Sequence, residues 1–250
     1  MLVWLFQTSA ISPSQLMFIS IRAKIFLVLS ICLVLAAAFI YAQTDRRHIN
    51  NNSVVLISSV GCRSAETRTV GTIIDGGFIL TVAHGVAGQN ANRIIFADGE
   101  TTQASIAVID SNLDLALLEF DQAPLRPLVK PIKFASAKPG ESVLFVAFND
   151  QTQFARDAKI KRRLKINTQD IYLREKTTRP GLEVELDVEV GNSGGPLLNK
   201  SGELVGIVWS TSRIVENRSW ATRSEAVTKL LASLSSNAIS PDAKPLACTG

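Results

Sequence analysis

The sequence predicts an all-β protein, a barrel or sandwich of short strands followed by one C-terminal helix. Runs of β-branched and aromatic residues recur at short intervals, separated by Gly, Asp and Pro turn signals. Only one segment, near the C-terminus, has a clear helical period. The chain has 250 residues, 46% of them hydrophobic, which suffices for one compact domain of two sub-barrels.

In the first half, the turn signals divide a series of strand-like runs. Asp75-Gly76-Gly77 and Asp98-Gly99 predict tight hairpin turns. Pro124, Pro127 and Pro131 break the segment that follows, as expected of a connection between two barrels. The expected strands are residues 53–59, 69–74, 78–82, 94–96, 104–109 and 115–120.

The second half repeats this pattern and ends in a helix. Strands are expected at residues 142–147, 159–166 and 182–190, and a hairpin joins 197–198 to 204–209 through the turn 199–202. Ser224 is predicted to cap a helix over residues 225–234, whose apolar side chains recur on one face.

The N-terminal segment predicts export. Arg22 and Lys24 precede the uncharged residues 25–44, with small residues near Ala42, the order found in secretory signals. The same uncharged stretch is long enough to span a bilayer as a helix. A cleaved signal peptide and a retained membrane tether both fit, and Met17 is an alternative start to Met1. Either way, the folded part is expected across a membrane from the cytosol.

The charge balance argues against a nucleic-acid partner. The formal net charge is +4, and Arg22 and Lys24 account for half of it, whereas phosphate binding needs clustered Lys and Arg. The basic run at residues 159–165 (KIKRRLK) is interpreted as a solvated hairpin rather than a site for an acidic partner or lipid.

Cysteines and histidines are few. Cys32 lies in the apolar stretch and lacks the small preceding residue of a lipoprotein signal. Cys62 and Cys248 either form a disulfide, as an oxidising compartment permits, or remain two thiols. His48, in a polar linker, and His84 are the only histidines, so histidine-dependent chemistry must use one of them.

Three motifs carry side chains suited to nucleophilic catalysis. Ser193 lies in the Gly-rich turn GNSGGP, where backbone N–H groups can point at a developing oxyanion. His84 lies in TVAHG, and histidine is the usual base that activates a serine hydroxyl. Asp114 opens an apolar run, where a buried carboxylate needs a partner such as an imidazole N–H.

Each motif alone has an ordinary structural explanation, but together they follow the order His, Asp, Ser, separated by 30 and 79 residues. With GTIIDGGFILTVAHGV and VGNSGGPLLNKSGELVGIV, the sequence resembles the trypsin-like (chymotrypsin-fold) peptidases, and within them the bacterial Deg/HtrA-like branch. The resemblance covers residues 53–234 and is poor over 149–180.

This resemblance implies two six-stranded antiparallel β-barrels with a C-terminal helix. The expected division is a signal peptide or anchor at 1–43, the N-terminal barrel at 44–130, the C-terminal barrel and helix at 131–236, and a tail at 237–250. No metal or cofactor is expected, and neither is a PDZ domain after the helix.

The resemblance also implies residue roles. Ser193 would be the nucleophile, His84 the base and Asp114 the residue that orients the imidazole, while the backbone N–H groups of Gly191 and Ser193 would form the oxyanion hole. Asn192 replaces the Asp that in digestive members pairs with a new N-terminus, so activation by N-terminal insertion is not expected.

Substrate preference is weakly encoded. Asp187 stands six residues before Ser193, the spacing of a pocket carboxylate that selects Arg or Lys, although the acidic alternation over 183–189 also fits a solvated strand face. Trp209 and Ser210 would line the same pocket, and the strand 208–211 would pair with the substrate backbone. Trp209 also lies at, or next to, the family's small Ser or Thr behind the catalytic Asp.

The predicted function is a serine endopeptidase acting on polypeptides. The rivals are a catalytically idle protease fold that binds peptides or serves as a membrane-tethered scaffold, and a structural protein of the cell envelope. The physiological substrate and the oligomeric state do not follow from the sequence.

Overall fold

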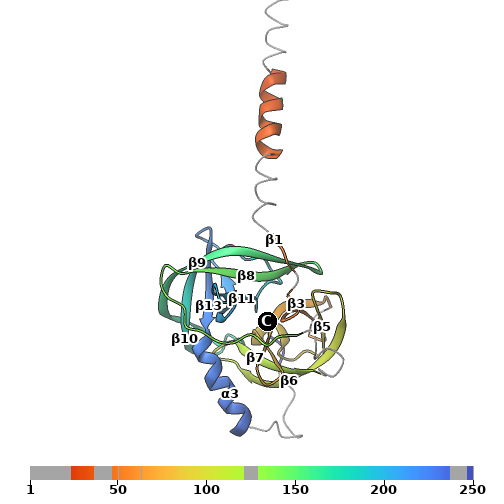
Figure 1. Cartoon of the computed structure of the whole chain (residues 1–250), viewed down its shortest axis with the longest axis vertical. Coiled ribbons are helices and arrows are strands. Elements are labelled where there is room, and N and C mark those ends of the chain that lie inside the picture. Colours follow the sequence, from red (N-terminus) through yellow and green to blue (C-terminus); the bar gives the residue numbers. More distant parts are fainter. Residues whose placement is uncertain are drawn as a thin grey trace, which may run out of the picture. The chain divides into compact units, whose positions relative to one another are not determined.

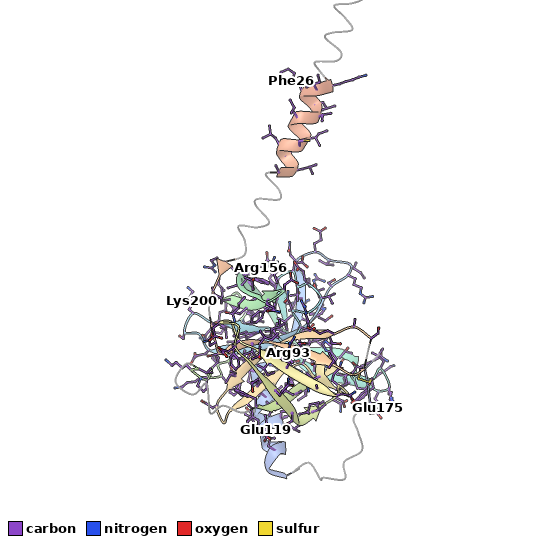
Figure 2. All side chains as sticks on the ribbon, turned by 90° about the vertical axis from the view of Figure 1, so that its right-hand side faces the viewer. Phe26, Arg93, Glu119, Arg156, Glu175 and Lys200 are labelled. Carbon is purple, nitrogen blue, oxygen red and sulfur yellow. A yellow bond between two sulfur atoms is a disulfide. The ribbon has the colours of Figure 1, made fainter. Side chains whose placement is uncertain are left out.

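The computed structural model describes residues 24–36, 47–49, 51–62, 64–120, 129–236 and 247–249. The chain divides into two units, residues 1–46 and 47–250. In the first unit a helix covers residues 24–36, and its apolar side chains project outward, as Phe26 does in Figure 2. Among the described residues, no helix has both the length and the apolar character needed to cross a bilayer. Met1, Met17 and the region around Ala42 lie outside the described residues.

The second unit contains a closed six-stranded antiparallel barrel in the order β2-β3-β4-β7-β6-β5. Its strands are β2 (Val54–Val60), β3 (Thr67–Ile74), β4 (Phe78–Thr81), β5 (Ala91–Ile95), β6 (Thr101–Asp110) and β7 (Leu115–Phe120). The expected turn at residues 75–77 joins β3 to β4, and Gly76 and Gly77 have φ angles of 87° and 82°, which glycine adopts without strain. A short helix, α2 (Ala83–Val86), follows β4.

A seven-stranded antiparallel sheet follows, in the order β1-β9-β10-β13-β12-β11-β8. Strand β9 also pairs with β8, so these pairings run in a ring through six strands, with β1 added along β9. The elements are β1 (Arg47–His48), β8 (Ser142–Asn149), β9 (Thr152–Gln169), β10 (Lys176–Glu185), β11 (Pro196–Leu198), β12 (Leu204–Thr211), β13 (Arg218–Arg223) and α3 (Val227–Ser236).

One buried cluster spans the barrel and the sheet, and a second, with Ile57, Ile79 and Leu118, lies on the barrel strands. Leu80 and Leu117 of the barrel belong to the same buried cluster as Phe145, Leu182 and Val208 of the sheet. Figure 1 shows β8, β9, β10 and β13 gathered on one side and β3, β5, β6 and β7 on the other, with α3 below. The site described next lies where these two groups meet.

The all-β class, the strand-rich halves and the C-terminal helix are confirmed, with two local corrections. The strand expected at 182–190 is wrong in its second half: β10 ends at Glu185, opposite the first residue of β13, Arg218, and the chain then leaves the sheet. Ser224 does not cap the helix, because its hydroxyl donates to the carbonyl of Ala135 at 2.6 Å and a 3-10 turn precedes α3.

The basic run at 159–165 lies on β9, and three of its five basic residues form ion pairs within the fold. Lys161 pairs with Glu185 at 2.9 Å, and Arg162 pairs with Glu183 on the neighbouring strand β10. Arg163 pairs with Glu225 at the start of the C-terminal helical segment. The acidic residues Glu183 and Glu185 of β10 therefore offset part of the positive charge of β9. The basic run is a sheet surface whose charges are partly paired with those of its neighbours.

Candidate active site

His84 lies on α2, immediately after the buried strand β4. This helix is a single turn, and the neighbouring Gly85 packs so closely on β3 that an added Cβ would lie 2.0 Å from a methyl carbon of Thr69. His84 itself is half-buried, with 35% of its side chain exposed. The sequence predicts a strand at 78–82 just before His84, but it does not predict the helical turn on which His84 lies.

Asp114 is the last residue of the turn between β6 and β7. Asp110 shapes this turn, because its carboxylate accepts hydrogen bonds from the backbone N–H groups of Asn112 and Leu113 at 3.0 and 2.8 Å. Asp114 then adopts a φ of 58°, a left-handed conformation that Asp tolerates better than most residues. Its side chain is 3% exposed, so the carboxylate needs partners within the protein.

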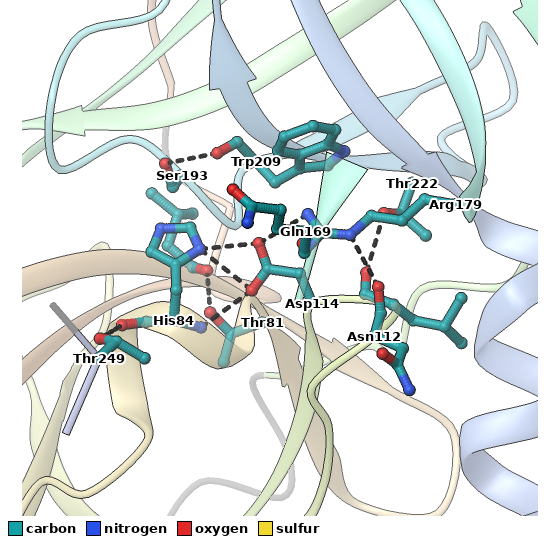
Figure 3. A network of polar contacts seen from close by, with 12 residues as sticks. Thr81, His84, Asn112, Asp114, Gln169, Arg179, Ser193, Trp209, Thr222 and Thr249 are labelled. Atoms are coloured by element: carbon teal, nitrogen blue, oxygen red, sulfur yellow. Dashed lines mark hydrogen bonds and ion pairs between the residues drawn. The ribbon is translucent and has the colours of Figure 1, made fainter. Parts of the chain in front are cut away.

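The first partner of Asp114 is His84. Nδ1 of the imidazole lies 2.8 Å from Oδ2 and 3.1 Å from Oδ1 of Asp114, and the backbone N–H of His84 donates to Oδ1 at 2.9 Å. A carboxylate only accepts hydrogen bonds, so these contacts assign the imidazole proton to Nδ1 and leave Nε2 as the basic nitrogen. Figure 3 shows the ring with Asp114 to its right and Ser193 above it.

Ser193 lies in a turn that the chain reaches after leaving β10. Gly191 and Gly194 have φ angles of 95° and 89°, so both use the conformational freedom that the Gly-rich motif provides. Asn192 between them is buried, and its side-chain oxygen accepts a hydrogen bond from the N–H of Phe148 on β8 at 3.3 Å. The Ser193 hydroxyl lies 3.5 Å from the carbonyl oxygen of Trp209.

Backbone contacts hold this turn against the strand that packs on α2. The N–H of Val70 on β3 donates to the carbonyl of Ser193 at 2.8 Å, and the N–H of Gly194 donates to Val208 on β12 at 2.7 Å. A Cβ on Gly194 would lie 2.0 Å from the carbonyl oxygen of Val70 and 2.8 Å from Oγ1 of Thr81. The nucleophile turn from one half and the histidine from the other therefore rest on the same strand.

The two amides predicted for the oxyanion hole belong to this turn. The described residues supply no acceptor for the N–H groups of Gly191 and Ser193, although the neighbouring amides of Asn192, Gly194 and Gly195 donate to carbonyl oxygens. Two backbone donors in one turn, without acceptors among the described residues, suit the stabilisation of a developing oxyanion.

Asp114 has a second partner, which the sequence analysis missed. Arg179 of β10 lies 3.3 Å from Oδ2 of Asp114, and both side chains are almost fully buried. The guanidinium lies over the ring of Trp209, 4.6 Å from its centroid. Arg179 thus contacts both Asp114 and Trp209, the residue expected at or next to the family's small Ser or Thr. Arg179 lies in the segment that matches the family poorly, and no motif marks it.

The C-terminal residues lie against the histidine. Cys62 and Cys248 form a disulfide with Cα atoms 5.5 Å apart. The hydroxyl of Thr249, one residue further, donates to the carbonyl oxygen of His84 at 2.8 Å, as Figure 3 shows. The sequence left the pairing open and gave no sign of the Thr249 contact.

The predicted substrate-pocket residues are not all together. Asp187 is exposed and lines a hollow of about 380 Å³ with residues 212–217, but Trp209 and Ser210 are not among its lining residues. The carbonyl of Asp187 accepts a hydrogen bond from Arg156 at 2.8 Å. Among the residues that the structure describes, no three His, Cys, Asp or Glu side chains gather in a way that could hold a metal ion.

Comparison with known proteins assigns the class. Residues 69–207 match the family model of the trypsin-like peptidase domain, which covers more than half of the chain, so the chain belongs to this family. The serine protease Rv3671c of Mycobacterium tuberculosis is 33% identical over 165 residues, and a probable periplasmic serine endoprotease, DegP-like, of Pseudomonas savastanoi pv. phaseolicola is 31% identical over 150 residues.

The chain matches less than half the length of these two relatives. The matched stretches cover 64% and 59% of this chain but only 40% and 30% of those two relatives. The crystal structure of the Rv3671c protease in its active form superimposes with a TM-score of 0.71 at 28% identity, covering 80% of this chain and 87% of that one. The trypsin-like fold extends over most of the chain.

Proposed function

We propose that this chain is a serine endopeptidase that hydrolyses peptide bonds through Ser193, His84 and Asp114. The observation that carries the proposal is the bidentate contact of Asp114 with the backbone N–H and Nδ1 of His84, which places the imidazole proton on Nδ1 and makes Nε2 the basic nitrogen. The likeness to the Rv3671c protease in its active form supports it. We further infer that the ring of strands in the sheet corresponds to the second six-stranded barrel of the family.

The proposed reaction passes through an acyl-enzyme. The Ser193 hydroxyl oxygen attacks the scissile carbonyl carbon while Nε2 of His84 takes its proton. The resulting imidazolium returns the proton to the leaving amine as the C–N bond breaks, and the acyl group stays on Ser193. Water, deprotonated by the same nitrogen, then attacks the ester, and the imidazolium returns this proton to the Ser193 oxygen as the ester bond breaks and the acid is released. Asp114 keeps the imidazole oriented and stabilises its charged form.

Both tetrahedral intermediates place a negative charge on the former carbonyl oxygen. The N–H groups of Gly191 and Ser193 are the proposed donors to this oxygen, because they lie in the turn that holds the nucleophile. Loss of one such donor typically slows the chemical step by about 100- to 1,000-fold. The buried side chain of Asn192, bonded to β8, would hold the turn without a newly cleaved N-terminus.

We propose that the peptidase acts outside the cytosol. The basic residues followed by an apolar stretch at 25–44, and the DegP-like relative that is described as periplasmic, both support export. The disulfide between Cys62 and Cys248 fits an oxidising compartment. Whether the N-terminal segment is cleaved or kept as a tether is decided by N-terminal sequencing of the exported protein.

A fluorophosphonate probe tests the proposed function. We expect covalent labelling of the wild type, loss of labelling in Ser193→Ala, and strong slowing in His84→Ala. Ser201→Ala, which removes an exposed turn hydroxyl away from the site, is the matched control and should label like the wild type. Folded protein that does not label would contradict catalysis and favour the idle, peptide-binding scaffold.

Asp187 gives the proposal a substrate preference. Its spacing, six residues before Ser193, supports a role near the substrate side chain, and the hollow that it lines with residues 212–217 is mixed in charge because of Arg213 and Glu216. If Asp187 selects substrates, a peptide-library profile should show cleavage after Arg or Lys, and Asp187→Asn should abolish that preference. A profile without basic preference would retire this role and leave Asp187 as a solvated residue.

A further inference from the structure

Arg179 is a charged residue that the triad chemistry does not name, yet it is buried beside the triad. Its side chain is 4% exposed, and its three guanidinium nitrogens contact oxygen atoms within the protein. Nη1 lies 3.3 Å from Oδ2 of Asp114, Nε donates to the carbonyl of Asn112 at 2.8 Å, and Nη2 donates to the carbonyl of Gln169 at 3.0 Å. One planar group thus connects β10, the turn that carries Asp114, and the end of β9.

Trp209 fixes the plane of this guanidinium. The β12–β13 pairing shifts register between Val208 and Ser210, so Trp209 is the extra residue of a β-bulge. Bulges re-aim side chains, and this one places the indole over the Arg179 guanidinium, 4.6 Å from the ring centroid. Within the described part of the chain the indole Nε1 is buried without a hydrogen-bond partner, so the ring face is what Trp209 contributes here. Figure 3 shows the indole above the line from Arg179 to Asp114.

The turn at residues 111–114, which carries Asp114, is also held by other residues of the sheet half. Thr222 of β13 donates to the carbonyl of Leu113 at 3.2 Å, and the N–H of Ile171 donates to the carbonyl of Ser111 at 3.1 Å. These bonds hold the turn backbone, but among them only Arg179 reaches the carboxylate that faces His84. A buried ion pair placed on the orienting residue of a triad can therefore act on the chemistry as well as on the fold.

We propose that Arg179 is a positioning residue of the triad, which holds the carboxylate of Asp114 in line with His84 and offsets part of its negative charge. This inference rests on the proposed peptidase function and deepens it. A carboxylate held between a fixed guanidinium and the imidazole cannot rotate away, and a misplacement of about 1 Å at a catalytic group can cost about 100-fold in rate.

The charges around Arg179 define the pH prediction. Burial lowers the pKa of the Arg179 guanidinium, and the carboxylates of Asp114, Asp110 and Asp170 counteract that effect, so an arginine here stays protonated. His84 faces Asp114 from the opposite side. With Arg179 present, the negative charge of the Asp114 carboxylate is already partly offset, so the carboxylate stabilises an imidazolium at His84 less. Without it, the unbalanced carboxylate favours the protonated imidazole, and a higher pH is needed to free Nε2.

Two substitutions separate charge from geometry. Arg179→Met removes both, and we expect fluorophosphonate labelling to slow about 10- to 100-fold and its acid limb to move up by about one pH unit. Arg179→Lys keeps a cation but not the planar fork, so labelling should slow while the acid limb stays near that of the wild type. Arg93→Met, an exposed position on β5, is the control and should match the wild type in both.

A second readout does not depend on catalysis. His48 and His84 are the only histidines, so NMR titration in a His48→Gln background follows the His84 ring alone. The titration midpoint should rise in Arg179→Met and stay in Arg93→Met. If wild-type protein does not label at all, the proposed function fails, and the NMR titration still decides whether Arg179 sets the charge at His84.

The outcomes that overturn the inference are specific. Arg179→Met with the wild-type labelling rate and acid limb would exclude a positioning role. An unchanged His84 midpoint would exclude the charge effect. If Arg179→Met does not fold, as judged by circular dichroism, Arg179→Lys decides: slowed labelling with an unmoved acid limb supports positioning, and the wild-type rate refutes it.

Discussion

Gly194, next to Ser193, has no room for a side chain, so replacing it tests how the nucleophile turn packs on β3. Its φ is 89°, and an added Cβ would lie 2.0 Å from the carbonyl oxygen of Val70 and 2.8 Å from Oγ1 of Thr81. Neither obstacle can move aside easily. The carbonyl oxygen of Val70 belongs to the backbone of β3, and the Thr81 hydroxyl is fixed because it donates a hydrogen bond to that carbonyl oxygen at 2.7 Å. Gly194→Ala must therefore displace the turn or the strand.

The expected loss of stability in Gly194→Ala has two parts. A positive φ costs a residue with a Cβ about 1–2 kcal/mol, and forcing extra atoms into a packed site typically adds about 1–3 kcal/mol. Gly194→Ala should thus lower the free energy of unfolding by about 2–5 kcal/mol. Gly202→Ala is the matched control, since its φ is 76° but nothing lies within 4 Å of the added Cβ. It should lose only the first part.

The assay is urea unfolding of both variants, with fluorophosphonate labelling measured on the folded fraction. Gly194→Ala should also label about 100-fold more slowly, because the backbone carbonyl of Ser193 is bonded to Val70 in the displaced contact. Gly202→Ala should label like the wild type. Equal destabilisation of the two variants, or normal labelling of Gly194→Ala, would refute the proposed packing of the turn on β3.

Two further results are expected. Replacing Cys62 and Cys248 together by Ser should lower the free energy of unfolding by about 2–5 kcal/mol in urea, and an unchanged midpoint would mean that the bridge adds nothing. Burial alone would raise the pKa of Glu225, but hydrogen bonds from Arg163 and Ser136 lower it below its ordinary value. Its stabilising contribution is then present at neutral pH and lost as the pH falls through the lowered pKa. Glu225→Gln should therefore have a lower thermal midpoint than the wild type at neutral pH and an equal one near pH 3; a deficit that persists in acid would contradict this.

The fold was predictable wherever the chain obeys a period. The strand runs 53–59 and 69–74 are rich in β-branched residues, and 115–120 is an apolar run after a turn, so local preference and burial agree there. The strand expected at 182–190 was wrong beyond Glu185 because alternation continues in the sequence after the partner strand β13 ends. Alternation of side chains along one strand does not show where the neighbouring strand of the sheet ends.

The candidate site divides in the same way. His84, Asp114 and Ser193 could be predicted as candidates because each lies in a local motif and their order is informative. Arg179 could not be found, because its role depends on three contacts, with Asn112, Asp114 and Gln169, that only tertiary structure creates. The Thr249 contact with His84 likewise depends on a disulfide that closes 186 residues of chain.

The most direct measurement is peptide mapping of the protein after brief reaction with p-nitrophenyl acetate in mildly acidic buffer, where an acyl-enzyme hydrolyses slowly. If the hydroxyl at position 193 is activated by the neighbouring imidazole, a single acetyl group should be found on Ser193, and none there in His84→Ala. Acetylation spread over other residues, or equal modification of Ser193 with and without His84, would contradict the catalytic role given to this arrangement.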